Sequence, residues 1–327
     1  MLDAGFGPLG PDALPGARDV LAQSQAENFP VAARFFPAAT RAHLMAVYGF
    51  ARLTDEIGDT VQGDRLAMLD WLESELERAA QGCARHPILV RLTPTIRQFD
   101  LGLDPFRRLI EANRADQVVK SYETFEALRG YCELSAAPVG RLVLEIFRAA
   151  TPERIGWSDD VCVGLQIVDH LQDVGEDARS GRIYLPAEDL RRFNCRPDDL
   201  IDDRAGPGVQ ALIRFEAARA TSLLGAGTAL ARSLHGRQRL AVLAFAGGGR
   251  AAIDAMSSAY FDVLGTRCRP RPVRMAYRIA TGLATGAARG RGIGPTPAPS
   301  TAPASSTAPA PSTAPALAPP IDKGEVT

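Results

Sequence analysis

The stretch that most constrains this chain runs from Leu165 to Pro186 and reads LQIVDHLQDVGEDARSGRIYLP. If it is helical, Asp169, Asp173 and Asp177 lie one turn apart on one face, with Glu176 alongside. Like charges at this spacing destabilise an isolated helix, so the presence of three acids on one face requires an explanation. Two interpretations are open: a solvated face, and a site for a hard cation, which prefers carboxylate oxygens.

A second stretch of the same kind favours the cation site. Asp55 and Asp59 are again four residues apart, at the end of an apolar helical run over residues 44–53. Two such helices facing each other would supply four carboxylates, and a phosphorylated ligand could contribute the remaining oxygens around Mg²⁺. This arrangement suits a diphosphate substrate, whose charge has to be neutralised before it leaves as an anion. The two pairs therefore predict Mg²⁺ binding by Asp55, Asp59, Asp173 and Asp177.

Charge and cysteine usage exclude several classes of protein. The formal net charge of -1 argues against nucleic acid as the main partner. A basic segment of seven arginines and no acid, Arg267–Arg291, is compatible with a solvated face or with contact to a diphosphate or an anionic membrane. The five scattered cysteines include no CxxC pair, which favours a reducing compartment and excludes the usual structural zinc site.

Composition also predicts the domain organisation. Residues 1–17 are rich in glycine and proline and are expected to form a flexible arm. Residues 18–291 are expected to form the folded domain. Residues 292–327 are an Ala/Pro/Ser/Thr tract that can bury little, so we expect disorder. We find no pattern of a signal peptide and no charge-free run of 18 apolar residues, which predicts that no segment spans a membrane.

Periodicity within the folded domain is helical. Asp64 is predicted to cap one helix, Pro87 to begin another, and Asp104-Pro105 to cap the next. No convincing run alternates apolar and polar residues, so the predicted fold class is all-α. The stretch Gly247–Ala252 matches G-x-G-x-x-A, but no parallel-sheet pattern precedes it, and we interpret it as a helix interruption. Further helical runs are expected at 122–149, 158–178, 207–235 and 237–265.

Together these motifs resemble the squalene/phytoene synthase family over roughly residues 25–275. The resemblance rests on the two aspartate pairs, on DVGEDARSGRIYLP, and on Tyr131-Cys132 and Pro138-Val-Gly140 between them. It implies an all-α isoprenoid synthase fold, a helical bundle around a central cavity with the two aspartate helices facing each other at its mouth. It also implies Mg²⁺ as cofactor and a prenyl diphosphate as substrate, so that the folded domain would be catalytic.

The resemblance implies further site residues. Arg52 matches a basic residue near the diphosphate, and Tyr48, Gly140 and Gln166 match positions that line the cavity. Tyr131 matches a tyrosine whose ring can stabilise a carbocation. Ordinary helix packing is the alternative for Tyr48, Tyr131, Gly140 and Gln166, because aromatic and glycine residues on helices often serve only that purpose.

Four departures from the commonest family pattern narrow the expected reaction. Asp169 replaces an asparagine and Gln172 an arginine of many condensing members; Glu27-Asn28 stands where a Ser-Lys pair is common, and Gly248 stands near a usual tyrosine. These changes remove groups suited to binding a second diphosphate. The stretches ENFPVA, VYGFARLTDEIGD and SAAPVGRLVL instead resemble the hydroxysqualene synthase branch of hopanoid biosynthesis. That branch ionises presqualene diphosphate and lets water capture the rearranged cation.

Alternatives remain at this stage. Asp169 is expected either to orient the attacking water or to support the metal indirectly. A head-to-head condensing prenyltransferase, which would use farnesyl or geranylgeranyl diphosphate to make squalene, presqualene diphosphate or phytoene, is the alternative activity. A non-catalytic assembly factor would be expected to have lost one of the four aspartates. We expect a cytoplasmic protein, with peripheral contact to the inner face of the membrane for its apolar product and with other enzymes of the pathway as partners.

Overall fold

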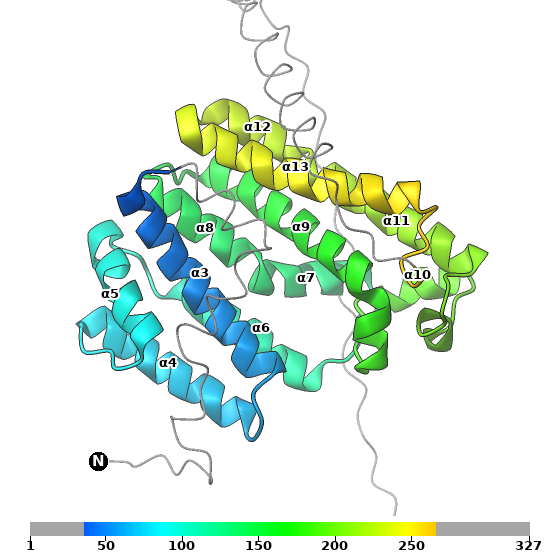
Figure 1. Ribbon diagram of the computed structural model, residues 1–327, viewed down its shortest axis with the longest axis horizontal. Helices are drawn as coiled ribbons and strands as arrows, with labels where there is room; N and C mark the ends of the chain where they lie inside the picture. Colours follow the sequence, from blue (N-terminus) through cyan, green and yellow to red (C-terminus); the bar gives the residue numbers. More distant parts are fainter. Residues whose placement is uncertain (1–35, 266–327) are drawn as a thin grey trace, which may run out of the picture. The chain divides into compact units, whose positions relative to one another are not determined.

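The structure is a computed structural model, and it describes residues 36–265. The chain divides into one unit, Met1–Arg289, which contains all described residues, and a second unit, Gly290–Thr327. The predicted arm and tail therefore lie outside the described residues. The described part contains no strand; its one isolated parallel bridge joins Ser121 to Ile183. The predicted all-α fold class is confirmed (Figure 1).

The helices follow one another with short connections. Their bounds are α3 Ala38–Asp59, α4 Arg65–Gln81, α5 Pro87–Phe99, α6 Asp104–Val118, α7 Phe125–Ser135, α8 Ala137–Ile146, α9 Pro152–Arg179, α10 Ala187–Arg192, the short 3₁₀ helix η3 Pro197–Leu200, α11 Pro207–Leu224, α12 Ala226–Ser233 and α13 Gly236–Ser258.

Helix starts largely follow the predicted capping residues. The Asp64 side chain accepts a hydrogen bond from the Ala67 amide at 3.0 Å, and Pro87 is the first residue of α5, as predicted. The expected cap at Asp104 is wrong, because Asp104 is the first residue of α6 and Leu103 precedes the helix as its cap residue. A carboxylate in the first turn still interacts favourably with the helix dipole there.

Two long predicted runs are each divided into two helices. Ala136 separates α7 from α8, since Pro138 starts a new first turn and cannot donate to the preceding helix. Gly225 separates α11 from α12. By contrast, α9 is longer than predicted, because Thr151 caps it by accepting from the Arg154 amide at 3.3 Å.

The predicted helix interruption at Gly247–Ala252 is wrong. These residues lie within the continuous helix α13. A Cβ at Gly249 would lie 2.8 Å from Leu165 Cδ2 on α9 and 3.0 Å from Leu224 Cδ1 on α11. The missing side chain thus lets α13 approach two neighbouring helices closely, which compensates for the low helix propensity of glycine.

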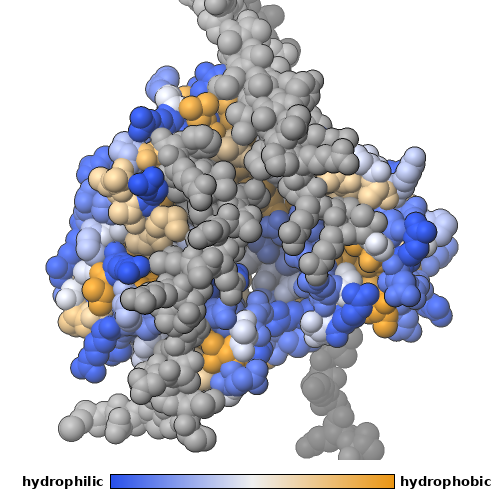
Figure 2. Space-filling model, in the orientation of Figure 1, coloured by the Kyte–Doolittle hydropathy of each residue, from blue (hydrophilic) through white to orange (hydrophobic). Residues whose placement is uncertain are grey.

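The buried hydrophobic residues form two clusters, and each contains one aspartate helix. The first cluster gathers residues of α3, α4, α5 and α8, and the second gathers residues of α7, α9 and α11. Helix α8 packs against both α3 and α9. The coloured surface in Figure 2 is mainly hydrophilic. The large exposed hydrophobic side chains of the described residues are Leu66, Val90, Val118, Ile201 and Tyr260.

Among residues 36–265, only α13 is long and apolar enough to cross a membrane. Of its most apolar window, 56% is buried inside the protein. The core helix of a globular protein meets the same criterion, so this helix is weak support for a span. The absence of a spanning segment stays a prediction.

Candidate active site

The first aspartate pair lies in the last two turns of α3, and both side chains are exposed. Residues from other elements hold this end of the helix. Asn113 of α6 donates from Nδ2 to Asp55 Oδ1 at 3.3 Å, and Gln117 donates to the Gly58 carbonyl at 3.0 Å. Arg182, which follows α9, places Nη1 2.6 Å from Asp59 Oδ1. The orientation of this pair therefore depends on tertiary contacts.

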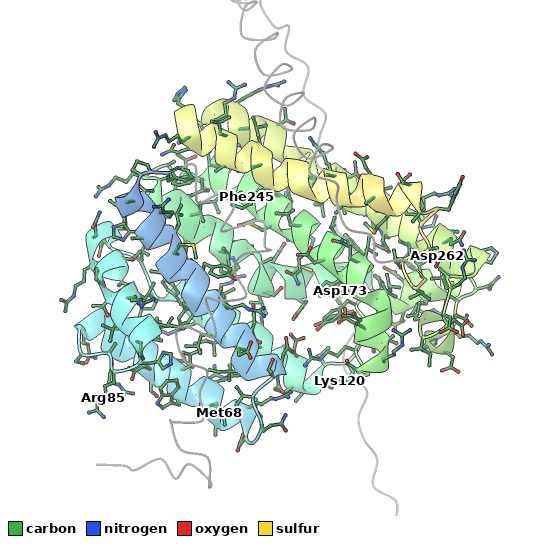
Figure 3. The ribbon with its side chains drawn as sticks, viewed as in Figure 1. Met68, Arg85, Lys120, Asp173, Phe245 and Asp262 are labelled. Carbon is green, nitrogen blue, oxygen red and sulfur yellow. The ribbon has the colours of Figure 1, made fainter. Side chains whose placement is uncertain are left out.

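The second pair lies in the C-terminal half of α9. Asp169 and Asp173 are exposed and Asp177 is half-buried. The Nδ1 atom of His170 lies 3.9 Å from Asp177 Oδ2, and this contact is an ion pair only when the imidazole is protonated. In Figure 3, Asp173 projects from the lower part of α9, with Lys120, which follows α6, below it in this view. The carboxylates of α9 thus occur on successive turns of one helix, as the sequence predicts.

A buried acid of α6 belongs to the same network of contacts. Asp116 of α6 is only 7% exposed, and it accepts hydrogen bonds from the Tyr131 hydroxyl at 2.6 Å and the Tyr184 hydroxyl at 3.1 Å. Burial raises the pKa of Asp116, although the two hydroxyls and the charge of Arg182 oppose this shift. Burial and the charge of Asp116 raise the pKa of Tyr131 strongly. Tyr131 therefore stays protonated, with its hydroxyl bonded to Asp116.

Aromatic contacts connect this acid to α9. The rings of His170 and Tyr184 stack with centroids 3.8 Å apart and an interplanar angle of 15°, and Gln166 contacts His170 through their ε2 nitrogens at 3.2 Å. Tyr131 also lies against Tyr184, at a centroid distance of 5.5 Å. Such stacked pairs contribute roughly 0.5–1.5 kcal/mol beyond the area they bury.

The segment Arg182–Tyr184 joins the two aspartate pairs. Its first residue contacts Asp59 on α3, and its last stacks on His170 of α9. Between them, the Ile183 amide donates to the Lys120 carbonyl at 2.8 Å, which fixes the segment beside the end of α6. Contacts from this one segment thus reach both aspartate helices.

The remaining predicted residues occupy varied positions. Tyr48 is buried in α3, and Arg52 Nη2 lies 4.0 Å from Glu56 Oε2 on the same helix. A Cβ at Gly140 would lie 2.4 Å from Ser158 Oγ and 2.6 Å from Cys162 Sγ, so this glycine allows close approach of α8 to α9. Contact of Tyr48, Arg52, Gly140 and Gln166 with a substrate stays a prediction.

Sequence reasoning missed several residues of this site. Arg182 and Tyr184 belong to the GRIYLP stretch, in which the sequence alone marks neither residue as part of a site. Asp116 lies in the polar sequence NRADQV, where nothing distinguishes it from a solvated acid, and Asn113 lies in the same stretch. His170 lies inside the acidic helix, between Asp169 and Asp173, and this position in the sequence is a signal that could have found it.

The donor set can be compared with what a divalent ion requires. Within the described residues, no three His, Cys, Asp or Glu side chains form a ready-made metal site. The two pairs nevertheless offer only carboxylate oxygens, the donors that Mg²⁺ prefers, and three of the four side chains are exposed. Mg²⁺ commonly binds through one or two carboxylates and completes its shell with substrate phosphates and water. The residues fit a metal that arrives with a phosphorylated ligand.

Comparison with known proteins shows to which family the chain belongs. The family model described as squalene/phytoene synthase matches residues 22–275. The chain belongs to this family. It is an isoprenoid synthase family of enzymes that generally depend on divalent metal ions, which confirms the predicted fold and enzymatic character.

Named relatives within the family differ in activity. The chain is 34% identical over 218 residues to a phytoene synthase of Arthrospira platensis, a match that covers 62% of this chain and 70% of the relative. It is also 34% identical over 220 residues to a hydroxysqualene synthase of Zymomonas mobilis, covering 65% and 73%. The crystal structure of squalene synthase HpnC from Alicyclobacillus acidocaldarius superposes with a TM-score of 0.70 at 41% identity, covering 75% of this chain and 93% of that one.

Proposed function

We propose that this family member is a hydroxysqualene synthase, which converts presqualene diphosphate and water to hydroxysqualene and diphosphate. The observation that carries the proposal is Asp169, an exposed carboxylate one turn before Asp173 on α9. Many condensing members have a neutral amide at this position. An additional negative charge beside a diphosphate site disfavours a second diphosphate but provides an acceptor for water.

The two aspartate pairs would hold the metal ions that neutralise the charge of the diphosphate. Asp55, Asp59, Asp173 and Asp177 would hold Mg²⁺, which supplies Lewis-acid stabilisation of the departing diphosphate. Arg52 lies one turn before Asp55 on α3 and would bind a diphosphate oxygen through its guanidinium. Because these groups lie at the C-terminal ends of α3 and α9, whose dipoles are negative there, positive charge is favoured at this site.

The interior would protect and direct the cation. The Tyr131 hydroxyl is bonded to Asp116, so the ring face is the part of this residue suited to stabilising a carbocation. Tyr48, Gly140 and Gln166 would line the space for the prenyl chains. Asp169 would accept a hydrogen bond from the attacking water; the water oxygen forms the new C–O bond, and the carboxylate takes the released proton.

A condensing prenyltransferase is the second candidate function. The observation in its favour is that a phytoene synthase and a hydroxysqualene synthase are equally similar to this chain, at 34% identity. The two activities differ in the substrate that is consumed. A condensing enzyme joins two prenyl diphosphates, whereas the proposed enzyme ionises one molecule that already contains both chains.

Product analysis with purified protein and Mg²⁺ separates the candidates. The proposal expects rapid conversion of presqualene diphosphate to hydroxysqualene and little consumption of farnesyl or geranylgeranyl diphosphate alone. Asp169→Asn, which restores the amide of condensing members, should lower alcohol formation by at least about tenfold. Comparable formation of presqualene diphosphate or phytoene from the shorter substrates would replace the proposal with the condensing function.

The apolar product also suggests where the enzyme works. We propose a cytoplasmic location with peripheral membrane contact during product release, because a triterpene alcohol partitions into lipid. Sedimentation of the protein with anionic phospholipid vesicles should increase when presqualene diphosphate and Mg²⁺ are present. Equal sedimentation with and without substrate would contradict contact linked to release.

A further inference from the structure

One acid of the first aspartate pair has a cationic partner. Asp59 Oδ1 lies 2.6 Å from Nη1 of Arg182. A guanidinium compensates the charge of a carboxylate and competes with a metal ion for the same oxygens. Asp59 is therefore not ready to bind a divalent ion while Arg182 contacts it.

The chain next to Arg182 is held by contacts that do not involve Asp59. Its neighbour Ile183 is fixed by the hydrogen bond to the Lys120 carbonyl, and Tyr184 is fixed by its hydrogen bond to Asp116 and its stack on His170. The Arg182 side chain is 17% exposed, against 54% for Asp59. Contacts of these neighbouring residues thus present a largely buried cation to an exposed acid, and the pair is less screened than one between two fully exposed side chains.

We propose that Arg182 is a resident counter-cation of Asp59, which a divalent ion must displace before it can bind that acid. Mg²⁺ loses its hydration water reluctantly, so without further ligands it gains little from competing for an occupied carboxylate. A diphosphate changes this balance, because it offers oxygens to the metal and a second anion to the released guanidinium. Metal binding at the first pair is then coupled to arrival of the diphosphate. This inference rests on the metal-binding role of Asp59 in the proposed function.

Direct metal binding tests the inference without turnover. Mn²⁺ is a suitable probe, since it shares the oxygen preference of Mg²⁺ and the free ion is counted by electron paramagnetic resonance. Without diphosphate, Arg182→Gln should bind Mn²⁺ at least about tenfold more tightly than the wild type, because a positive charge beside the metal is removed. Arg182→Lys keeps the charge but loses the planar fork, and should bind about threefold more tightly.

A matched control removes an arginine that pairs elsewhere. Arg191 pairs with Glu123, both side chains are more than 60% exposed, and neither belongs to an aspartate pair. Arg191→Gln should bind Mn²⁺ as the wild type does. Added inorganic diphosphate should reduce the difference between wild type and Arg182→Gln, since the displaced guanidinium then has another anion to bind.

The outcomes separate this inference from the proposed function. If Asp59→Asn weakens Mn²⁺ binding but neither Arg182 variant strengthens it, the counter-cation is overturned and the metal role of Asp59 stands. If Asp59→Asn leaves Mn²⁺ binding unchanged with and without diphosphate, the metal role itself fails. Equal tightening in Arg182→Gln and Arg191→Gln would show a general charge effect and would also overturn the inference.

Discussion

The two aspartate pairs have the same spacing but are supported differently. At the end of α3, Asp55 and Asp59 contact Asn113 and Arg182, which come from other parts of the fold. On α9, Asp177 has His170 of its own helix as a neighbour. The comparison teaches that acids of equal sequence spacing can have neighbours of different origin. Arg182 reaches Asp59 from a distant part of the sequence, whereas His170 lies on the same helix as Asp177.

The largest expected effect would show whether the two pairs contribute equally. Asp55→Asn and Asp173→Asn should each lower turnover of presqualene diphosphate by roughly 10²–10³-fold, because each removes one charged oxygen ligand of the metal. Both side chains are exposed, so thermal unfolding should stay close to that of the wild type. Near-normal turnover in both variants would refute the metal role of the pairs.

A second experiment removes a hydrogen bond of the buried Asp116, which also bonds to Tyr184 of the segment between the two pairs. Tyr131→Phe removes a hydrogen bond to the buried Asp116, and we expect a loss of about 1–3 kcal/mol in the free energy of unfolding. Tyr122→Phe is the matched control, since the buried Tyr122 hydroxyl has no hydrogen-bond partner among residues 36–265. Its removal should cost little or even stabilise. Urea denaturation measures both, and equal losses would show that the ring packing matters and the bond to Asp116 does not.

A third experiment uses pH to test the contact between α10 and α11, which lies directly after the segment Arg182–Tyr184. Helix α10 follows that segment, and its Asp189 contacts Arg219 of α11, which also binds Glu216 Oε1 at 2.8 Å. Burial and the neighbouring Asp189 raise the pKa of Glu216 to about 8, although the charge of Arg219 opposes the shift. The folded protein therefore keeps a proton that the unfolded chain releases near pH 4.5.

The sign of the pH effect follows from this difference. Stability from the Glu216 proton is fully present below about pH 4.5 and is lost as pH rises through about 8. Between pH 6 and pH 8.5, the wild type should lose on the order of 2–3 kcal/mol relative to Glu216→Gln, which keeps a neutral amide there. Glu111→Gln changes an exposed acid and serves as control. Parallel pH profiles of wild type and Glu216→Gln would contradict the raised pKa.

The features of this site that could be predicted depend on residues close to one another in the sequence. Both aspartate pairs, the all-α class and the cap at Asp64 follow from residues within a few positions of one another. Arg182 and Asp59 are 123 residues apart, and no periodic pattern connects them. Asp116 is buried and accepts hydrogen bonds from two tyrosines of later segments, Tyr131 and Tyr184. Patterns within a single sequence do not reveal such contacts.

The helix boundaries show the same limit. Gly225 ends a helix, but Gly247–Gly249 continue one, because close packing of α13 against Leu165 and Leu224 favours a residue without a side chain. The intrinsic preference of glycine is identical in the two places. Only the tertiary neighbours differ, and they decide which glycine interrupts a helix.

The reaction itself gives the most direct test of the proposed function. Purified protein is incubated with Mg²⁺ and presqualene diphosphate in ¹⁸O-labelled water, and the product is analysed by mass spectrometry. The proposed function predicts hydroxysqualene that carries one labelled oxygen. An alcohol without the label, or no conversion of presqualene diphosphate while farnesyl diphosphate is consumed, would contradict it.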